Sequence, residues 1–383
     1  MTKTTAACGL HGRHALPLLL AALTICSCQK KLRGICNCSP GDYVTTTTVF
    51  STGFNNPRGL KFGPDGYLYV AEAGIGGSNP ATCTNVLPPV GPYTGSDTGA
   101  RISRVSPGGT RTTWVTGLPS SQTAPTQGSL VSGVGDIAFI GNTLYGILAG
   151  AGCSHGVADI PNGVVRVNSN HSWTGITDLS AFQQANPVAH PNPPDFEPDG
   201  TWYSMIAVGN DLYAVEPNHG ELDRITPKGA VSRVIDISAA EGHIVPTAIT
   251  WHKDAFYVGN LDIFPIVAGS ASVYRITPGG SISVYATGFT TIVGVLFDQL
   301  GGLYVLENTT GNAFPTPGTG DIVRVDPSGV REIIASGLNL PTAMTMGPDN
   351  KIYVSVWGFG GSPGMGEIDV IDISCSKQVV SVK

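Results

Sequence analysis

The sequence predicts an all-β protein built from six equivalent four-stranded units. The first observation is a short strand-like phrase, centred on a tyrosine, that occurs six times. Its copies are LYVAEAG at Leu68, LYGILAG at Leu144, LYAVEPN at Leu212, FYVGNLD at Phe256, LYVLENT at Leu303 and IYVSVWG at Ile352. Their tyrosines are 76, 68, 44, 47 and 49 residues apart. A period near 45 residues is typical of one supersecondary unit per copy.

A second phrase keeps phase with the first and is the second observation. It reads ISRVSPGG at Ile102, VVRVNSNH at Val164, LDRITPKG at Leu222, VYRITPGG at Val273 and IVRVDPSG at Ile322, with a degraded copy, IDVIDISC, at Ile368. This phasing disfavours six unrelated strands of a sandwich. Each unit therefore has four strands, A to D, with hairpin signals such as Pro64-Asp65-Gly66 between A and B. Six such units leave exposed edges unless they close into a ring, so we expect a six-bladed β-propeller.

Composition is the third observation. The chain has 51 glycines among 383 residues, and only 13% of its residues are charged. Average proteins have about 7% glycine and about 25% charged residues, so many tight turns between short strands are expected. The net charge of −6 comes with no basic stripe and no aromatic RNA-binding motif. Nucleic-acid binding is therefore excluded as a function class.

The first 28 residues have the pattern of a secretory signal. A basic start precedes the apolar run 15–25, which at 11 residues is too short to span a bilayer. The run ends in a sequence that resembles a bacterial lipoprotein box with Cys28 as the lipidated residue; an ordinary signal cleaved nearby is the alternative. Residues 29–41 are expected to form a tether and 42–383 the propeller. The expected location is the bacterial cell envelope, as a monomer held at the outer membrane or in the periplasm by the lipid alone, or secreted.

The two ends of the chain are expected to meet in the last blade. The β-branched segment 42–50 precedes the first unit and can supply the outer strand of the sixth unit, which closes the ring. The segment 377–382 competes for that place. If 42–50 pairs there, Cys36 or Cys38 lies close enough to bridge to Cys375.

A second cysteine pair is predicted between neighbouring blades. Cys83 and Cys153 both lie in insertions between strands B and C, in units one and two, and so on the same face of the ring. A disulfide between them fits an exported protein, and free thiols are the alternative.

One face of the ring is expected to carry the functional site. In a propeller the B-to-C loops and the D-to-A connections share one face, and the long polar insertions 74–99, 149–162 and 308–320 all lie there. Insertions gathered on one face of a repeat fold commonly mark a binding face. The starts of the A strands are expected to line its mouth, with Arg58, Asp136, Tyr203 and Thr247. A proline-rich insertion at 186–198 is predicted to be stiff and exposed.

Strand B ends at this mouth in polar residues at equivalent positions, namely Glu72, Glu216, Asn260 and Glu307. Hard oxygen ligands of this kind suit a divalent, Ca²⁺-like ion. In the alternative interpretation each glutamate caps a loop backbone or pairs with an arginine such as Arg101. His219 and His243 lie near the same opening, where a histidine beside carboxylates can act as a general acid or base. The alternative for both is a solvated loop residue.

Several phrases resemble one protein family. TGFNNPRGLKFGPDGYLYVAEAGIGG, VYRITPGG with SVYATGF, and GLNLPTAMTMGPDNKIYVS are similar to the ScyD/ScyE family, NHL-like propellers named for cyanobacterial scytonemin gene clusters. The resemblance covers about residues 46–373 and implies an exported six-bladed propeller. More distantly the chain is similar to gluconolactonase-type lactonases, streptogramin lyases and strictosidine-synthase-like proteins. The lactonase likeness implies a divalent ion near Glu72, Asn260 and Glu307.

Two hypotheses of function follow. In the first, the insertion-rich face binds a small molecule, a glycan or a partner protein without chemistry. In the second, the chain is a metal-dependent lactonase or lyase that uses the four strand-end residues as ligands and His219 or His243 as acid or base. The sequence contains no Gly-x-Ser-x-Gly elbow and no phosphate-binding glycine loop. No helical periodicity of useful length follows the signal.

Overall fold

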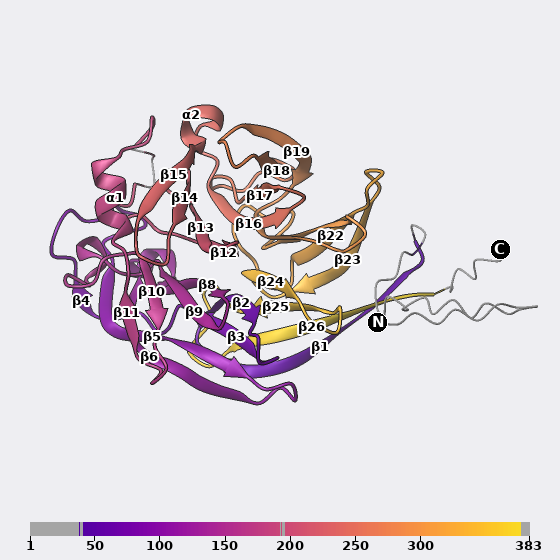
Figure 1. Ribbon diagram of the computed structural model, residues 1–383, viewed down its shortest axis with the longest axis horizontal. Helices are drawn as coiled ribbons and strands as arrows, with labels where there is room; N and C mark the ends of the chain where they lie inside the picture. Colours follow the sequence, from indigo (N-terminus) through magenta and orange to yellow (C-terminus); the bar gives the residue numbers. More distant parts are fainter. Residues whose placement is uncertain (1–37, 39–40, 192, 194–195, 377–383) are drawn as a thin grey trace, which may run out of the picture. The chain divides into compact units, whose positions relative to one another are not determined.

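A computed structural model describes residues 38, 41–191, 193 and 196–376, all within one unit, Gly34–Lys383. Six antiparallel sheets follow one another around a central axis (Figure 1). The prediction of a propeller with six four-stranded blades is confirmed. The predicted lipidation site Cys28, the bridge candidate Cys36 and the competing strand 377–382 lie outside the described residues. In the described part of the chain, no helix has the length and apolar character needed to cross a membrane.

The strands of each blade run outward from the axis in the order A to D. Blade one contains β2(Pro57–Phe62), β3(Leu68–Glu72), β5(Thr94–Val105) and β6(Arg111–Gln122), with short β4(Asn79–Pro80) and β7(Val131–Ser132) added to the same sheet. Blade two contains β8(Val134–Ile140), β9(Thr143–Leu148), β10(Val164–Val167) and β11(Trp173–Gly175). Blade three contains β12(Ser204–Val208), β13(Asp211–Glu216), β14(Glu221–Ile225) and β15(Val231–Asp236).

The second half of the ring repeats this order. Blade four contains β16(Pro246–His252), β17(Ala255–Asn260), β18(Ala271–Ile276) and β19(Ile282–Phe289). Blade five contains β20(Ile292–Phe297), β21(Leu303–Glu307), β22(Gly320–Val325) and β23(Arg331–Leu338). Blade six contains β24(Ala343–Met346), β25(Ile352–Val356) and β26(Gly366–Cys375), and its outer strand is β1(Tyr43–Phe54).

The repeated tyrosine has a packing role that explains the repeated phrase. In blade one, the Tyr69 ring is buried against the next blade, edge-on to Phe139 at 5.1 Å. Its hydroxyl donates to Asp65 at 3.0 Å, in the turn between strands A and B. Blade six repeats the arrangement, with Tyr353 donating to Asp349 at 3.2 Å. The aspartate of the turn and the tyrosine of the next strand therefore act as a pair, so the two recur together in the sequence.

The ring is continuous at its axis. Each inner strand contacts the inner strand of the next blade, and β24 contacts β2. The segments β1 and β26, far apart in the sequence, lie side by side (Figure 1) and pair antiparallel with Tyr43 opposite Cys375. A disulfide joins Cys38 to Cys375 next to this pair, and a second joins Cys83 to Cys153.

Two features differ from the sequence prediction. The described residues include two short α-helices, α1(Leu179–Ala185) and α2(Ile237–Glu241), each in a connection between blades and each capped by an aspartate, Asp178 and Asp236. They contain too few residues to produce a helical period in the sequence. The proline-rich insertion, predicted to be exposed, contributes Val188 and Glu197 to the buried set. It is held by other segments: the Ala189 amide donates to Asp236, the N-terminal cap of α2, at 2.7 Å, and Glu197 accepts from the Tyr93 hydroxyl at 3.1 Å.

Candidate functional site

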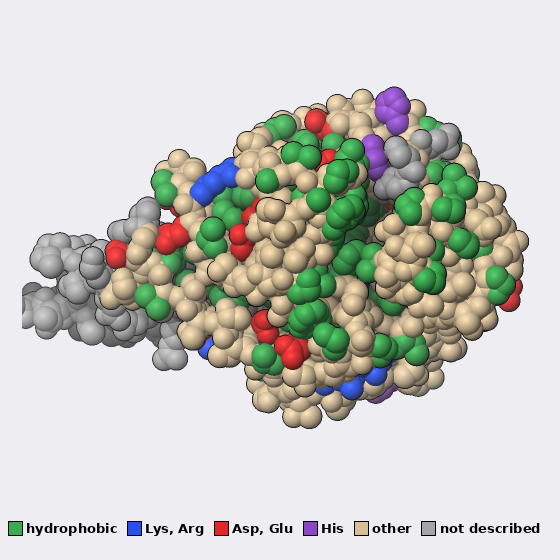
Figure 2. Space-filling model, turned by 180° about the vertical axis from the view of Figure 1, so that it is seen from behind, with side chains coloured by type: hydrophobic (Ala, Val, Ile, Leu, Met, Phe, Trp, Pro, Cys, Tyr) green, Lys and Arg blue, Asp and Glu red, His purple; other side chains and the backbone are tan. Residues whose placement is uncertain are grey.

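A cavity of about 190 Å³ opens near the axis. Figure 2 shows hydrophobic side chains gathered around a hollow on the face seen from behind. The cavity wall combines aromatic, aliphatic, amide and hydroxyl side chains with one arginine and one glutamate. The lining residues are Arg58, Glu197, Thr201, Tyr203, Pro217, Asn218, Val245, Thr247, Leu261, Phe264, Val293, Asn308, Pro315, Thr342 and Phe359.

The lining includes three of the four A-strand residues expected at the mouth. Arg58, Tyr203 and Thr247 line the cavity, whereas Asp136 does not. The Asp136 carboxylate is buried and accepts hydrogen bonds from the backbone of Ile137 and Met205, at 2.8 and 2.9 Å. It packs where a side chain on Gly59 would collide with it, so the glycine permits this approach of blades one and two. Asp136 therefore joins neighbouring blades.

The four strand-end residues point into their own loops. Glu72 accepts a hydrogen bond from the Asn55 amide at 2.6 Å, and Glu216 accepts one from the Thr201 amide at 2.8 Å. Glu307 accepts one from the Thr290 amide. Each of these amides belongs to the connection that leads into the A strand of the same blade. A buried carboxylate that accepts backbone N–H groups satisfies donors that would otherwise be lost on burial.

Blade four uses an amide for the same purpose. The Asn260 side chain donates to the Ile244 carbonyl at 2.9 Å and accepts from the Ser272 amide at 2.7 Å. In blade one the carboxylate is paired in addition with Arg101, whose Nη2 lies 2.8 Å from Glu72 Oε2. These contacts correspond to the loop-capping interpretation of the sequence pattern. We call Glu72, Glu216, Asn260 and Glu307 the loop clamps.

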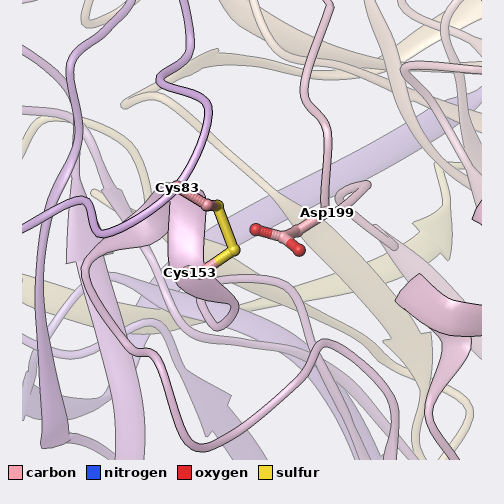
Figure 3. Close-up of side chains that lie close together, drawn as sticks. All are labelled: Cys83, Cys153 and Asp199. Atoms are coloured by element: carbon pink, nitrogen blue, oxygen red, sulfur yellow. A yellow bond between two sulfur atoms is a disulfide. The ribbon is translucent and has the colours of Figure 1, made fainter.

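The loop clamps do not gather around one point. Among the described histidines, cysteines, aspartates and glutamates, one group of three has its ligand atoms within 4.8 Å of one another, and it consists of Cys83, Cys153 and Asp199. Two of these are bonded to each other (Figure 3), and the Asp199 carboxylate beside them accepts from the Ser154 amide at 2.8 Å. The three glutamates proposed as metal ligands are thus separated and already bonded.

The residue after three of the four loop clamps faces the cavity; Ala73, which follows Glu72, does not line it. Pro217, Leu261 and Asn308 line the cavity, and each follows a clamp directly in the sequence. The clamp turns into its own loop, and the next side chain then faces the opposite way. The sequence therefore identified the correct strand ends, but the cavity wall begins one residue later.

The buried acids of the clamps have unequal proton affinities. Burial and the neighbouring Asp321 carboxyl raise the pKa of Glu307 to about 9. Two neighbouring carboxylates repel each other when both are ionised, so ionisation of the second is disfavoured. For Glu216, burial acts against ionisation, but the His219 side chain and backbone N–H groups outweigh it and lower the pKa. At neutral pH the Glu307–Asp321 pair therefore holds a proton, whereas the Glu216 carboxylate is ionised.

The two candidate catalytic histidines are not part of the cavity wall. The His219 ring is buried, with Nδ1 3.5 Å from Glu216 Oε2. Burial would lower the pKa of His219, but the Glu216 carboxylate prevails and raises it. His243 is half-buried ahead of β16. His219 thus interacts with Glu216, the loop clamp of blade three.

Glu197 is the lining residue with the most extensive buried support. Its Oε1 accepts from the Tyr93 hydroxyl at 3.1 Å, and Oε2 lies 3.5 Å from His155 Nε2. The other ring nitrogen of His155 is 2.9 Å from the Ser121 hydroxyl. Sequence reasoning missed this group because its members come from three separate insertions, and no local motif connects them. It also missed Phe264 and Phe359. The available signal for each was an aromatic residue just beyond the end of a B strand, β17 for Phe264 and β25 for Phe359.

Comparison with known proteins supports the fold. No family model and no curated protein matches the sequence. Among solved structures, a protein of unknown function from Bacteroides thetaiotaomicron is similar with a TM-score of 0.54 at 13% identity, covering 87% of this chain and 76% of that one. A gluconolactonase from Xanthomonas campestris is similar with a TM-score of 0.53 at 9% identity, covering 86% and 90%.

A third similar structure is the aldose sugar dehydrogenase of Streptomyces coelicolor in its PQQ-bound form, with a TM-score of 0.52 at 13% identity, covering 88% of this chain and 99% of that one. At these identities the likeness shows the architecture alone. The chain is thus a six-bladed propeller whose structural neighbours include lactonases and sugar dehydrogenases. The ScyD/ScyE resemblance stays a prediction.

Proposed function

We propose that the protein binds a small, largely apolar molecule in the mouth cavity and performs no chemistry on it. The observation that carries this proposal is the wall itself, where Tyr203, Phe264 and Phe359 stand among aliphatic side chains with few polar groups. Ligand sites are typically apolar hollows in which a small number of polar groups fix orientation. The cavity volume is below the roughly 300–1,000 Å³ of drug-sized sites, so the ligand is small.

The separation of the loop clamps favours binding over lactonase chemistry. A metal-dependent lactonase or lyase in this chain would need Glu72, Glu216 and Glu307 to leave the backbone amides they bind. Leaving a buried amide donor without its acceptor costs about 1–3 kcal/mol for each bond. A glycan or a partner protein would have to recognise the same apolar mouth.

We also propose that the protein is exported and anchored through a lipid on Cys28. Two disulfides in the described chain support export, because such bonds persist in oxidising compartments. Radiolabelled palmitate should be incorporated by the full chain expressed in a bacterial host and absent from the Cys28→Ser variant. Equal labelling of both chains would contradict the anchor.

The binding proposal is tested with a neutral single-ring probe, 4-hydroxybenzyl alcohol. Saturation-transfer NMR should show contact with the wild-type protein and loss of contact in Phe359→Ala, which removes part of the wall. Tyr285→Ala is the control, since Tyr285 is 45% exposed on the outer strand β19 and does not line the cavity. Absence of transfer in the wild type, or equal loss in both variants, would contradict the proposal. Melting curves of each variant establish that it is folded.

A further inference from the structure

Arg58 is the arginine of the cavity wall, and its close partners are aromatic rings and a backbone carbonyl. Its Nη2 donates to the Val131 carbonyl at 2.6 Å, and the guanidinium carbon lies 6.0 Å from the ring centres of both Tyr203 and Phe359. Five arginines of the described chain are bonded to a carboxylate, namely Arg101, Arg104, Arg224, Arg233 and Arg324. In that part of the chain, no carboxylate forms an ion pair with Arg58.

The cavity thus presents a cation that is held in place and lacks an anion. Aromatic rings near the guanidinium, a backbone carbonyl and the Tyr203 hydroxyl hold its plane, and a guanidinium has five N–H donors, so donors remain for a ligand. A planar guanidinium binds a carboxylate through two parallel hydrogen bonds, and the bond is stronger where apolar walls exclude water. Without a counter-ion, a guanidinium that is half-buried among aromatic rings lowers the stability of the folded protein.

Glu197, the other ionisable residue of the wall, is already engaged by the protein. Its oxygens face the Tyr93 hydroxyl and the His155 ring, which belong to the insertions of blades one and two. It therefore does not neutralise Arg58.

A second polar atom of a lining residue, Asn308 Oδ1, can accept a hydrogen bond that no described residue donates. Asn308 is 4% exposed, and its amide nitrogen donates to the Pro341 carbonyl at 2.7 Å. Its Oδ1 is buried and receives no hydrogen bond from any residue in the described ranges. A buried acceptor without a donor is costly, and a ligand hydroxyl would satisfy it once the side chain of this cavity-lining residue turns Oδ1 toward the cavity.

We infer that the ligand is a single-ring aromatic carboxylic acid that carries a hydroxyl group. Its carboxylate binds the Arg58 guanidinium, its ring packs against Tyr203 and Phe359, and its hydroxyl donates to Asn308 Oδ1. A cavity of about 190 Å³ corresponds to the volume of about six waters, which suits one ring with two substituents. This inference rests on the proposed binding function and adds the chemical class of the ligand.

The test compares 4-hydroxybenzoate with 4-hydroxybenzyl alcohol, which has a neutral CH2OH group in place of the carboxylate, by isothermal titration calorimetry at neutral pH. The wild type should bind the acid about tenfold more tightly than the alcohol, since a charge-assisted bond contributes at least that factor. Arg58→Gln should raise the Kd of the acid by about tenfold to a hundredfold and leave that of the alcohol nearly unchanged. Arg58→Lys should give a Kd for the acid between those of the wild type and Arg58→Gln, because lysine keeps the charge but cannot form two parallel hydrogen bonds.

Arg331→Gln is the matched control. The Arg331 guanidinium also lies over an aromatic ring, 4.4 Å from the centre of Phe289, and donates to backbone carbonyls, but it does not line the cavity. This variant should change neither Kd. Equal affinity of the wild type for the two probes would overturn the acid inference and leave the binding proposal standing. Failure of both probes to bind at millimolar concentration would overturn both.

Benzoate tests the role of Asn308, because it lacks the hydroxyl. Weaker binding of benzoate than of 4-hydroxybenzoate is expected in the wild type. Equal binding would remove the hydroxyl from the inferred ligand class.

Discussion

Breaking the Cys38–Cys375 bond should destabilise the protein more than breaking Cys83–Cys153. The first bridge joins residues 337 apart, beside the pairing of β1 with β26, and the second joins residues 70 apart. A cross-link stabilises mainly by restricting the unfolded chain, so its effect grows with the length of the loop it closes. The chain-entropy relation gives about 6 kcal/mol for the first bridge and about 4 kcal/mol for the second. The expected difference between the two is thus about 1–2 kcal/mol.

The assay is equilibrium unfolding in guanidinium chloride of two matched double variants, Cys38→Ser with Cys375→Ser and Cys83→Ser with Cys153→Ser. Both replace a bonded pair by two serines, so the difference in unfolding free energy isolates the position of the bridge. Reduction of the wild type should lower the midpoint as well. An unchanged curve for the first variant, or a larger loss in the second, would refute the reasoning that the termini are held together by β1, β26 and this bond.

Three further predictions concern the loop clamps. The folded pKa of Glu307, near 9, is above its ordinary 4.5, so the folded state holds the proton and stability should fall as pH rises between those values. Glu307→Gln should remove this loss of stability, so its Tm should depend less on pH between 5 and 8 than that of the wild type. An equal slope of Tm against pH in the two proteins would contradict the raised pKa of Glu307. Glu216→Ala should lower the unfolding free energy by about 2–4 kcal/mol by removing the acceptor of the Thr201 and His219 amides, whereas a loss below 1 kcal/mol would count against the clamp. Calorimetric titration of metal-stripped protein with Ca²⁺ should give no binding heat, and micromolar binding lost in Glu72→Gln would instead favour the metal hypothesis.

The fold could be predicted because its signals are local and repeated. The Pro-Asp-Gly turn and the tyrosine that follows lie four residues apart, and the structure shows that they bond to each other. Every copy of the phrase marks a B strand, and the copies in blades one and six share this contact, whereas the Tyr304 hydroxyl of blade five accepts from Arg324. The helices α1 and α2 left no signal, because seven and five residues are too few to establish a period.

The candidate site could be predicted only in part. Residue types at strand ends pointed to the mouth, and Arg58, predicted to lie there, lines the cavity. Which of two successive residues faces the axis depends on whether the first is needed by its own loop, and the sequence does not encode that choice locally. The contact of His155 with Glu197 depends on two insertions folding against each other, 42 positions apart, which no spacing rule describes.

The central claim is that the strand-end acids hold the loops while their neighbours form a ligand site. The most direct measurement is a crystal structure of the protein grown with both calcium chloride and 4-hydroxybenzoate. The account predicts the aromatic acid between Arg58, Phe359 and Asn308, with Glu72, Glu216 and Glu307 still on their loop amides. A calcium ion shared by those three glutamates, with the cavity free of the acid, would contradict it.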